Sequence, residues 1–157
     1  MKGAKILEAV IKRRIYEFMS YSYEKKILMF KVFFIMGVSR AAILILPENK
    51  LRSYFGEKNS ETPYIAEEKY YKIAENISWA VKKTAPHTPW KSQCLVQALT
   101  VQKMLKSKGI SSTLYLGVNG KRKSEIKAHS WLRVGSRYVL GGSGEEYHII
   151  GKFKSVI

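Results

Sequence analysis

The 157-residue chain contains no aspartate, a single cysteine and only 12 acidic residues. One cysteine excludes an internal disulfide and is typical of proteins from a reducing compartment, which favours the cytoplasm. All the acidic residues are glutamates, so no other carboxylate side chain is available to a site. The cysteine and three scattered histidines lack the spacing of a metal site, and the glycine-rich run 141–144 lacks the lysine of a phosphate-binding loop. We therefore expect neither a metal nor another cofactor.

The shortage of acid leaves a formal net charge of +16, carried by 28 lysines and arginines. These residues are spread along the chain, with small clusters at Lys12–Arg14 and Lys121–Lys123. The charge is compatible with a solvated basic surface, and equally with attraction to an acidic peptide, an acidic partner protein or an anionic membrane face. No recognised DNA- or RNA-binding module is present, so we do not expect nucleic acid as a partner.

Long apolar runs are confined to the N-terminal third. Residues 1–23 carry apolar side chains at helical spacing, and 27–46 is the most apolar stretch, ended by Pro47. Lys31 and Arg40 lie within that stretch, which favours a core helix, or a helix packed on a partner, over a membrane span.

The polar segment 57–63 predicts a linker. It would separate an N-terminal helical segment, 1–56, from a C-terminal core, 64–157. The core begins with a further helical pattern over 64–84 and a proline-containing loop over 85–90.

The only cysteine, Cys94, is predicted at the N-terminus of a helix that ends near Lys106, with Gly109 just beyond it and Ser92 as the cap. Unpaired N–H groups and the helix dipole stabilise a thiolate there. Cys94 also shares a stripe with the apolar residues of the buried face, so an inert core cysteine fits the same pattern.

An antiparallel sheet is predicted after this helix. Residues 112–118 alternate in polarity, meet an Asn119–Gly120 turn and a basic loop, and return as a strand over 128–134 with His129 and Trp131 on one face. A two-residue turn at 135–136 leads into the next strand and places Gly142 opposite His129. A helix end that abuts such a sheet brings a thiol to an imidazole, the arrangement of a nucleophile and its base.

The motif P-W-x3-C-L-x2-A-L-x4-M-L-x3-G is followed by L-x-L-G-V and then by A-H-S-W-L-x-x-G-x-x-Y-V-L-G-G. With these blocks, residues 27–142 resemble the leader peptidases of lasso-peptide biosynthesis, the peptidase half of the split B protein. These enzymes belong to the transglutaminase-like branch of the papain-like fold. The resemblance implies an α+β fold in which a central helix packs against an antiparallel sheet, with an N-terminal helical part.

The resemblance also implies a function. Cys94 would be the nucleophile and His129 its general base and later acid, in an enzyme that cuts the leader from a ribosomally synthesised precursor. The partners it implies are the leader-bearing precursor peptide, a small, separately encoded protein that grips the leader, and the lasso cyclase. A backbone N–H near Cys94 is a natural oxyanion donor, and the Gln93 side chain is a second candidate.

The third catalytic residue departs from the family, whose members often carry an aspartate about a dozen residues after the histidine. Here that position is Gly141. Glu145 or Glu146, folding back, is the predicted orienter of the imidazole. Ser143 and a backbone carbonyl are the alternatives.

Trp131 and Trp90 are candidate substrate-binding residues, although core packing explains Trp131 equally well. Two alternatives to the peptidase also stay open. One is a basic, non-catalytic scaffold that binds a partner protein or peripherally associates with a membrane through 27–46. The other is a different acyl-transfer enzyme of the same fold.

Overall fold

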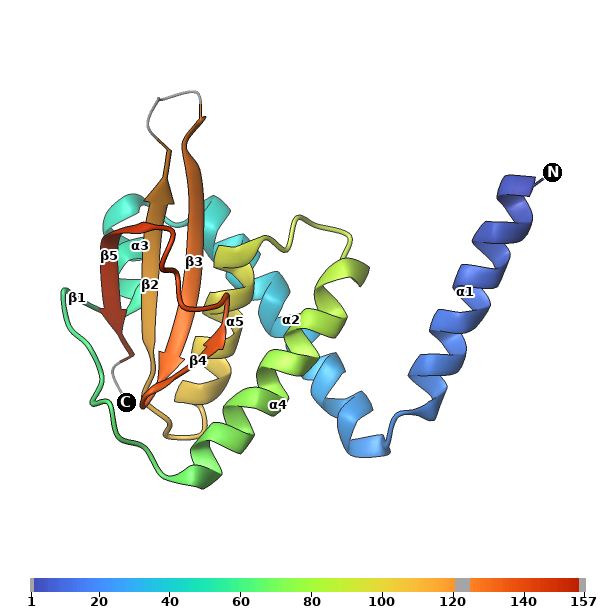
Figure 1. The fold of residues 1–157 in the computed structure, drawn as a ribbon, viewed down its shortest axis with the longest axis horizontal. Coiled ribbons are helices and arrows are strands. Elements are labelled where there is room, and N and C mark those ends of the chain that lie inside the picture. The colour runs from blue at the N-terminus through green and yellow to red at the C-terminus, as the bar shows by residue number, and fades with distance from the viewer. Residues whose placement is uncertain (1, 121–124, 156–157) are drawn as a thin grey trace.

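The computed structural model describes residues 2–120 and 125–155, which form an α+β fold (Figure 1). The helices are α1 (Lys2–Ser20), α2 (Tyr23–Ile45), α3 (Glu48–Phe55), α4 (Glu68–Thr84) and α5 (Cys94–Lys106), with a 3₁₀ turn, η1, at Ala85–His87. The strands are β1 (Glu57–Lys58), β2 (Thr113–Asn119), β3 (Lys127–Val134), β4 (Arg137–Leu140) and β5 (His148–Lys154). They form one antiparallel sheet in the order β1-β5-β2-β3-β4, which confirms the predicted fold class.

Helix α5 is the centre of the fold. It contacts α2 and α4 on its helical side and β2 and β3 on its sheet side. Most of its residues are consequently buried: Val96, Ala98, Leu99, Thr100, Val101, Gln102, Met104 and Leu105. The helix ends as predicted, because Gly109 adopts a left-handed φ of +69° and the N–H of Ile110 donates to the carbonyl of Leu105 at 3.0 Å.

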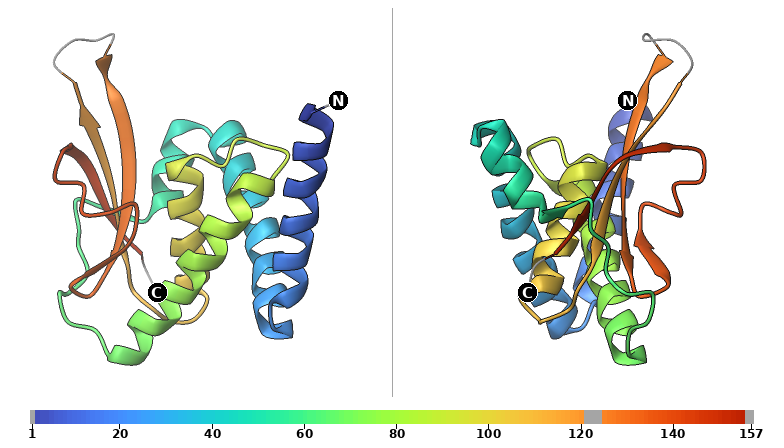
Figure 2. Two further views of the ribbon diagram at one scale, coloured as in Figure 1. Left: turned by 45° about the vertical axis from the view of Figure 1, so that its right-hand side comes forward. Right: turned by 90° about the vertical axis from the view of Figure 1, so that its left-hand side faces the viewer.

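The two faces of the sheet differ in chemistry because successive strand residues point to opposite sides. Leu114 pairs with Leu132, and both join the aliphatic core beneath the helices. Tyr115 pairs with Trp131, and their rings stack on the opposite face at 5.6 Å between centroids. Figure 2 (right) shows the helices on one side of the sheet and the segment between β4 and β5 on the other.

The face away from the helices holds a buried ion pair. Arg133 is 0% exposed, and its guanidinium donates to the carboxylate of Glu61 at 3.2 Å and to the carbonyl of Thr62 at 3.0 Å. Tyr115 accepts a hydrogen bond from Arg133 and donates one to Glu61, and burial raises the pKa of its hydroxyl to about 12. Lys152 donates to the second carboxylate oxygen of Glu61 at 2.8 Å. These bonds hold the charges where water is largely excluded.

The segment 57–63, expected to be a linker, is therefore packed against the sheet. Its first two residues form β1 and pair with β5. Thr62 is buried, and its N–H donates to the hydroxyl of Thr113 at 2.9 Å. On either side of this segment, α2 and α4 contribute to the same aliphatic core.

The predicted β2–β3 hairpin is confirmed, with Asn119 paired to Lys127 at its open end. The basic residues 121–124 of its loop lie outside the described residues. The two-residue turn between β3 and β4 is also confirmed, since Val134 pairs with Arg137. A β-bulge then shifts the register, so Leu132 faces Leu140. The predicted alignment of Gly142 with His129 is wrong because a simple count omits this extra residue.

The N-terminal helices diverge from each other (Figures 1 and 2). Ser22 caps α2, its hydroxyl accepting from the N–H of Lys25 at 3.4 Å. Helix α2 is long and apolar enough to cross a membrane by length and composition, and only 17% of its most apolar 18-residue window is buried. The buried face, formed by Val32, Met36 and Ser39, packs into the core.

Candidate active site

Cys94 is the first residue of α5 and its side chain is half-buried. The cap differs from the prediction. Gln93 occupies the N-cap position in an extended conformation, with no side-chain capping bond. The Ser92 hydroxyl is instead 2.7 Å from that of Thr88, so it is held within the preceding loop.

The start of α5 leaves backbone N–H groups beside the thiol. Within the described residues, the first N–H with an acceptor in the helical pattern is that of Gln97, which donates to the carbonyl of Gln93 at 3.0 Å. The N–H groups of Cys94, Leu95 and Val96 therefore lack an intrahelical acceptor. They form a positive helix end that favours an anionic sulfur, or a carbonyl oxygen gaining negative charge.

Trp90 anchors the loop that leads to Cys94. Its ring packs 5.0 Å from that of Phe33 between centroids, and a Cβ at Gly37 would come within 3.2 Å of it. Trp90 is half-buried against α2. The observed contacts thus give it a structural role in positioning the start of α5.

His129 is the third residue of β3, and its imidazole has a specific backbone partner. Nε2 lies 2.7 Å from the carbonyl oxygen of Gly141, the residue directly after β4. A carbonyl only accepts hydrogen bonds, so Nε2 must carry the proton. In the neutral ring this leaves Nδ1 with the lone pair, which makes Nδ1 the atom able to accept a proton.

Gly141 is suited to this contact because it has no side chain. Its φ is +80°, and a Cβ would lie 2.6 Å from the carbonyl oxygen of Ser130 and 2.8 Å from the Cβ of Trp131. An aspartate here would meet both the strained backbone and these atoms. Gly141 thus presents a main-chain oxygen to the imidazole in place of a carboxylate.

Glu145 and Glu146, the predicted orienters, are exposed. In the part of the chain that the structure describes, neither is hydrogen-bonded to His129, and Ser143 is exposed as well. The backbone-carbonyl alternative accounts for the observed contact. Sequence reasoning missed this partner's identity because a carbonyl group is common to every residue.

Trp131 is buried, which agrees with core packing, the alternative that the sequence left open for it. Only 1% of the side chain is exposed. Tyr115 stacks on it, and a Cβ at Gly144 would come within 2.3 Å of the indole. Tyr147, which sequence reasoning missed, packs 5.0 Å from the His129 ring between centroids. Trp131 and Tyr147 support the imidazole from the sheet side and from the following loop.

The structure brings Cys94 and His129 onto neighbouring elements, because α5 packs against β3. Their side chains are not hydrogen-bonded to each other within the described residues. His129 shares its sheet face with Trp131, the face away from the helices, and its Nε2 contacts the carbonyl of Gly141 directly after β4.

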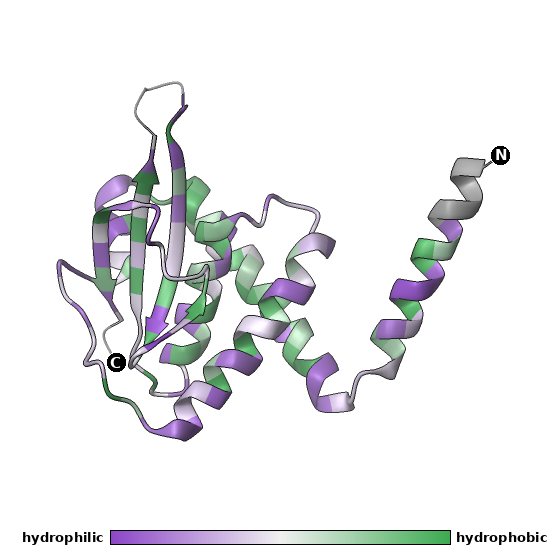
Figure 3. Ribbon diagram, viewed as in Figure 1, coloured by the Kyte–Doolittle hydropathy of each residue, from purple (hydrophilic) through white to green (hydrophobic). Residues whose placement is uncertain are grey.

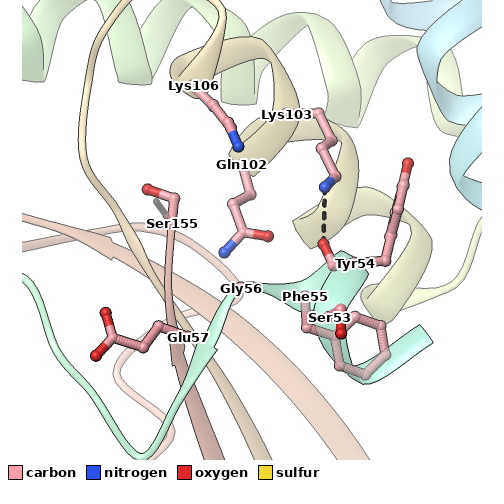
Figure 4. Close-up of a pocket in the computed structure, with 9 residues that line it drawn as sticks. All are labelled: Ser53, Tyr54, Phe55, Gly56, Glu57, Gln102, Lys103, Lys106 and Ser155. Carbon is pink, nitrogen blue, oxygen red and sulfur yellow. Dashed lines mark hydrogen bonds between the residues drawn. The ribbon is translucent and has the colours of Figure 1, made fainter. Parts of the chain in front are cut away.

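A separate cavity of about 250 Å³ lies toward the other end of α5 (Figure 4). Gln102 points into it, 2% exposed, with no hydrogen-bond partner for its amide within the described residues. Lys103 donates to the carbonyl of Tyr54 at 2.7 Å, and burial, helped by Lys106, lowers its pKa. Eight positions along a helix correspond to about 12 Å, which separates Gln102 from Cys94.

Comparison with known proteins yields one family. Residues 34–151, about three quarters of the chain, match the family model described as the transglutaminase-like superfamily. No curated protein and no solved structure matches the chain. The matched region extends from α2 to β5 and contains Cys94, His129 and the segment 57–63.

Proposed function

The chain belongs to the transglutaminase-like superfamily, and we propose that it is a cysteine peptidase that removes the leader from a ribosomally synthesised lasso-peptide precursor. The fold is compatible with cysteine-protease and acyl-transferase chemistry. One observation carries the proposal. The only cysteine begins the central helix, beside a strand whose histidine is held in the tautomer of a base by the carbonyl of Gly141.

The proposed reaction follows from these groups. Nδ1 of His129 takes the thiol proton of Cys94, and the thiolate attacks the scissile carbonyl carbon. N–H groups at the start of α5 stabilise the resulting oxyanion, and the exposed Gln93 side chain is a second donor. The imidazolium then protonates the leaving amine, which becomes the N-terminus of the core peptide. Water, deprotonated by His129, hydrolyses the thioester and regenerates the thiol.

The thiol–imidazole contact is proposed to tighten when the peptide binds. Catalytic hydrogen bonds are often long in unliganded enzymes and shorten in the substrate complex. The carbonyl of Gly141 orients the ring but carries no net charge. Because hydrogen bonds to an ionised partner are roughly twice as strong, this carbonyl stabilises the imidazolium less than a carboxylate would.

Alkylation of Cys94 tests the pair without a substrate. The chain has one cysteine, so one added iodoacetamide group in the intact mass reports on this thiol alone. We expect wild type to react faster than His129→Ala at neutral pH, and the difference to shrink at alkaline pH, where the thiol ionises without a neighbouring base. The control is His148→Ala, an exposed residue on β5. Equal rates in wild type and His129→Ala would remove the proposed base.

Cleavage tests the substrate class. The enzyme, the leader-bearing precursor and the small leader-binding protein are mixed, and mass spectrometry follows the leader and core fragments. Cys94→Ala should retain the helical circular-dichroism signal and lose cleavage, by at least about 10³-fold. His148→Ala should cleave like wild type. Cleavage by Cys94→Ala at the wild-type rate would end the peptidase proposal.

The acyl-transferase alternative shares every step up to the thioester, so the acceptor distinguishes it. Adding a primary amine to the cleavage mixture gives a fragment with a free carboxylate if water is the acceptor. An amide with the added amine indicates acyl transfer. The scaffold alternative predicts that the alkylation rate of Cys94 does not depend on His129 and that the precursor peptide is not cleaved.

A further inference from the structure

Helices α1 and α2 leave an apolar groove open between them. Its volume is about 620 Å³, and Ile11, Ile15 and Phe18 of α1 line it together with Phe30 and Phe34 of α2. Figure 3 shows apolar turns along both helices. Arg14, Glu17 and Lys83 also line the groove, and Lys83 pairs with Glu17, so Arg14 is the cationic group beside the apolar side chains that has no ion pair among the described residues.

The apolar surface continues beyond the groove along the outer side of α2. Ile27, Phe30, Phe34, Val38 and Ile45 are all exposed, Phe34 by 68%. Their spacing of three, four and seven residues places them on one stripe, opposite the face that carries Val32 and Met36. From Ile27 to Ile45 this stripe extends for about 27 Å. Contiguous apolar surface of this extent is typical of an interaction site.

The burial of the opposite face argues against a membrane span. Val32 and Met36 are 0% exposed, and α2 packs against α4 and α5. Trp90 also packs onto α2 at Gly37. Moving α2 across a bilayer would expose this part of the core, so the helix must use its outer stripe while the domain remains folded.

The net positive charge of residues 1–56 indicates what kind of partner this apolar surface would contact. Residues 1–56 contain eleven lysines and arginines and four glutamates. Lys26 and Lys31 flank the exposed stripe of α2 by helical position, and Lys12, Arg13 and Arg14 are exposed on α1. An apolar stripe with basic flanks is the pattern of helices that lie in the interface of an anionic membrane.

We propose that the α1–α2 face, defined by the groove and the outer stripe of α2, docks onto the surface of an anionic phospholipid bilayer. The apolar side chains enter the boundary between headgroups and acyl chains, and the basic residues contact the phosphates. A single peptide helix in the groove would leave Val38 and Ile45 uncovered. A second copy would bring two strongly basic faces together, which charge repulsion opposes.

Vesicle sedimentation tests this proposal independently of peptidase activity. The full-length protein is mixed with vesicles of phosphatidylglycerol and phosphatidylcholine in equal parts, or of phosphatidylcholine alone. We expect binding to the anionic vesicles and at least tenfold weaker binding to the neutral ones. Replacing Lys12, Arg13 and Arg14 by Gln should weaken binding on the order of 100-fold, at about fivefold for each charge near the surface.

The apolar contribution has a matched control. Phe30→Ser combined with Phe34→Ser should weaken binding to anionic vesicles at least tenfold, while Ile149→Ser combined with Ile150→Ser should not. All four positions are exposed, and thermal unfolding verifies that both double variants fold. Undiminished binding by the phenylalanine variant, or no sedimentation of wild type, would overturn the proposal.

Two further outcomes identify the other occupants. Protein that stays in the vesicles at 1 M NaCl and at alkaline pH indicates a span rather than a docked surface. A dimer in light scattering that the phenylalanine variant loses, without vesicle binding by wild type, assigns the face to a second copy. Either result contradicts the proposal.

Discussion

Helices α2 and α5 show how little apolar composition alone says about burial. Helix α2 is the more apolar of the two, yet its stripe from Ile27 to Ile45 faces solvent. Helix α5 contains Thr100 and Gln102, and both are buried because elements cover the helix on several sides. Position between the helical layer and the sheet, rather than apolar composition, decides burial.

The largest expected effect sharpens this comparison directly. Leu99→Ala in α5 removes a side chain that is 0% exposed, and we expect it to lower the free energy of unfolding by about 2–5 kcal/mol. Phe34→Ala in α2 removes a larger but exposed side chain and should change it by about 0.5 kcal/mol or less. Urea unfolding measures both. Similar losses would mean that the α2 stripe is buried in solution.

Substitution of Gly141 tests the packing of the candidate active site. The adjacent Gly142, whose backbone is also left-handed, serves as the comparison. Gly141 and Gly142 have φ values of +80° and +76°, but only at Gly141 would a Cβ meet other atoms. We expect Gly141→Ala to cost about 2–4 kcal/mol and Gly142→Ala about 1–2 kcal/mol, because overpacking adds to strain only at Gly141. Equal losses in thermal unfolding would contradict the contact with Trp131.

The buried ion pair of the sheet contrasts with a surface pair of the N-terminal helices. Glu61→Gln leaves Arg133 buried without its carboxylate, and we expect a loss of about 1.5–3 kcal/mol in urea unfolding. Glu48→Gln breaks an exposed pair with Arg52 on α3 and should cost about 0.5 kcal/mol or less. A larger loss for Glu48→Gln would reverse this ranking.

A smaller effect of the same site appears in its pH dependence. The hydrogen bond from Lys152 is the main cause that lowers the pKa of Glu61 from its usual 4.5, against the opposing effect of burial. A carboxyl group whose pKa is lower in the folded state than in the unfolded state stabilises the fold above pH 4.5. This stabilisation is lost as the pH falls through the folded-state pKa. The stability difference between wild type and Glu61→Gln should therefore shrink on acidification. A difference that grows below pH 4.5 would contradict this sign.

Local sequence rules predicted much of the sheet and of α5. Alternating polarity over β2 and β3 and the turn at Gly135–Ser136 correspond to the observed pairings, and Gly109 ends the helix as expected. The wrong predictions, the cap of α5 and the β3–β4 register, concern features that depend on contacts with other residues. Ser92 satisfies the preference for a cap, but Thr88 takes its hydroxyl, and the bulge beside Leu132 depends on how β4 packs.

The candidate site was only partly readable for the same reason. Cys94 and His129 carry side chains whose chemistry stands out in a chain with one cysteine. The partner of His129 is a main-chain oxygen, and because every residue has one, the sequence does not indicate which residue supplies it. The burial of Trp131 depends on the loop that folds over it. The roles of Cys94 and His129 in catalysis stay predictions that alkylation and cleavage test.

The sequence by itself determined the α+β class, the helix that begins near Cys94, the strand that carries His129 and the basic, apolar N-terminal third. Those features depend on the spacing of neighbouring residues and on composition. Only the tertiary structure decided that Gly141 orients the imidazole, that Trp131 is sealed beneath a loop and that the outer face of α2 remains uncovered. Each of these depends on which distant segments meet, and local spacing carries no information about that.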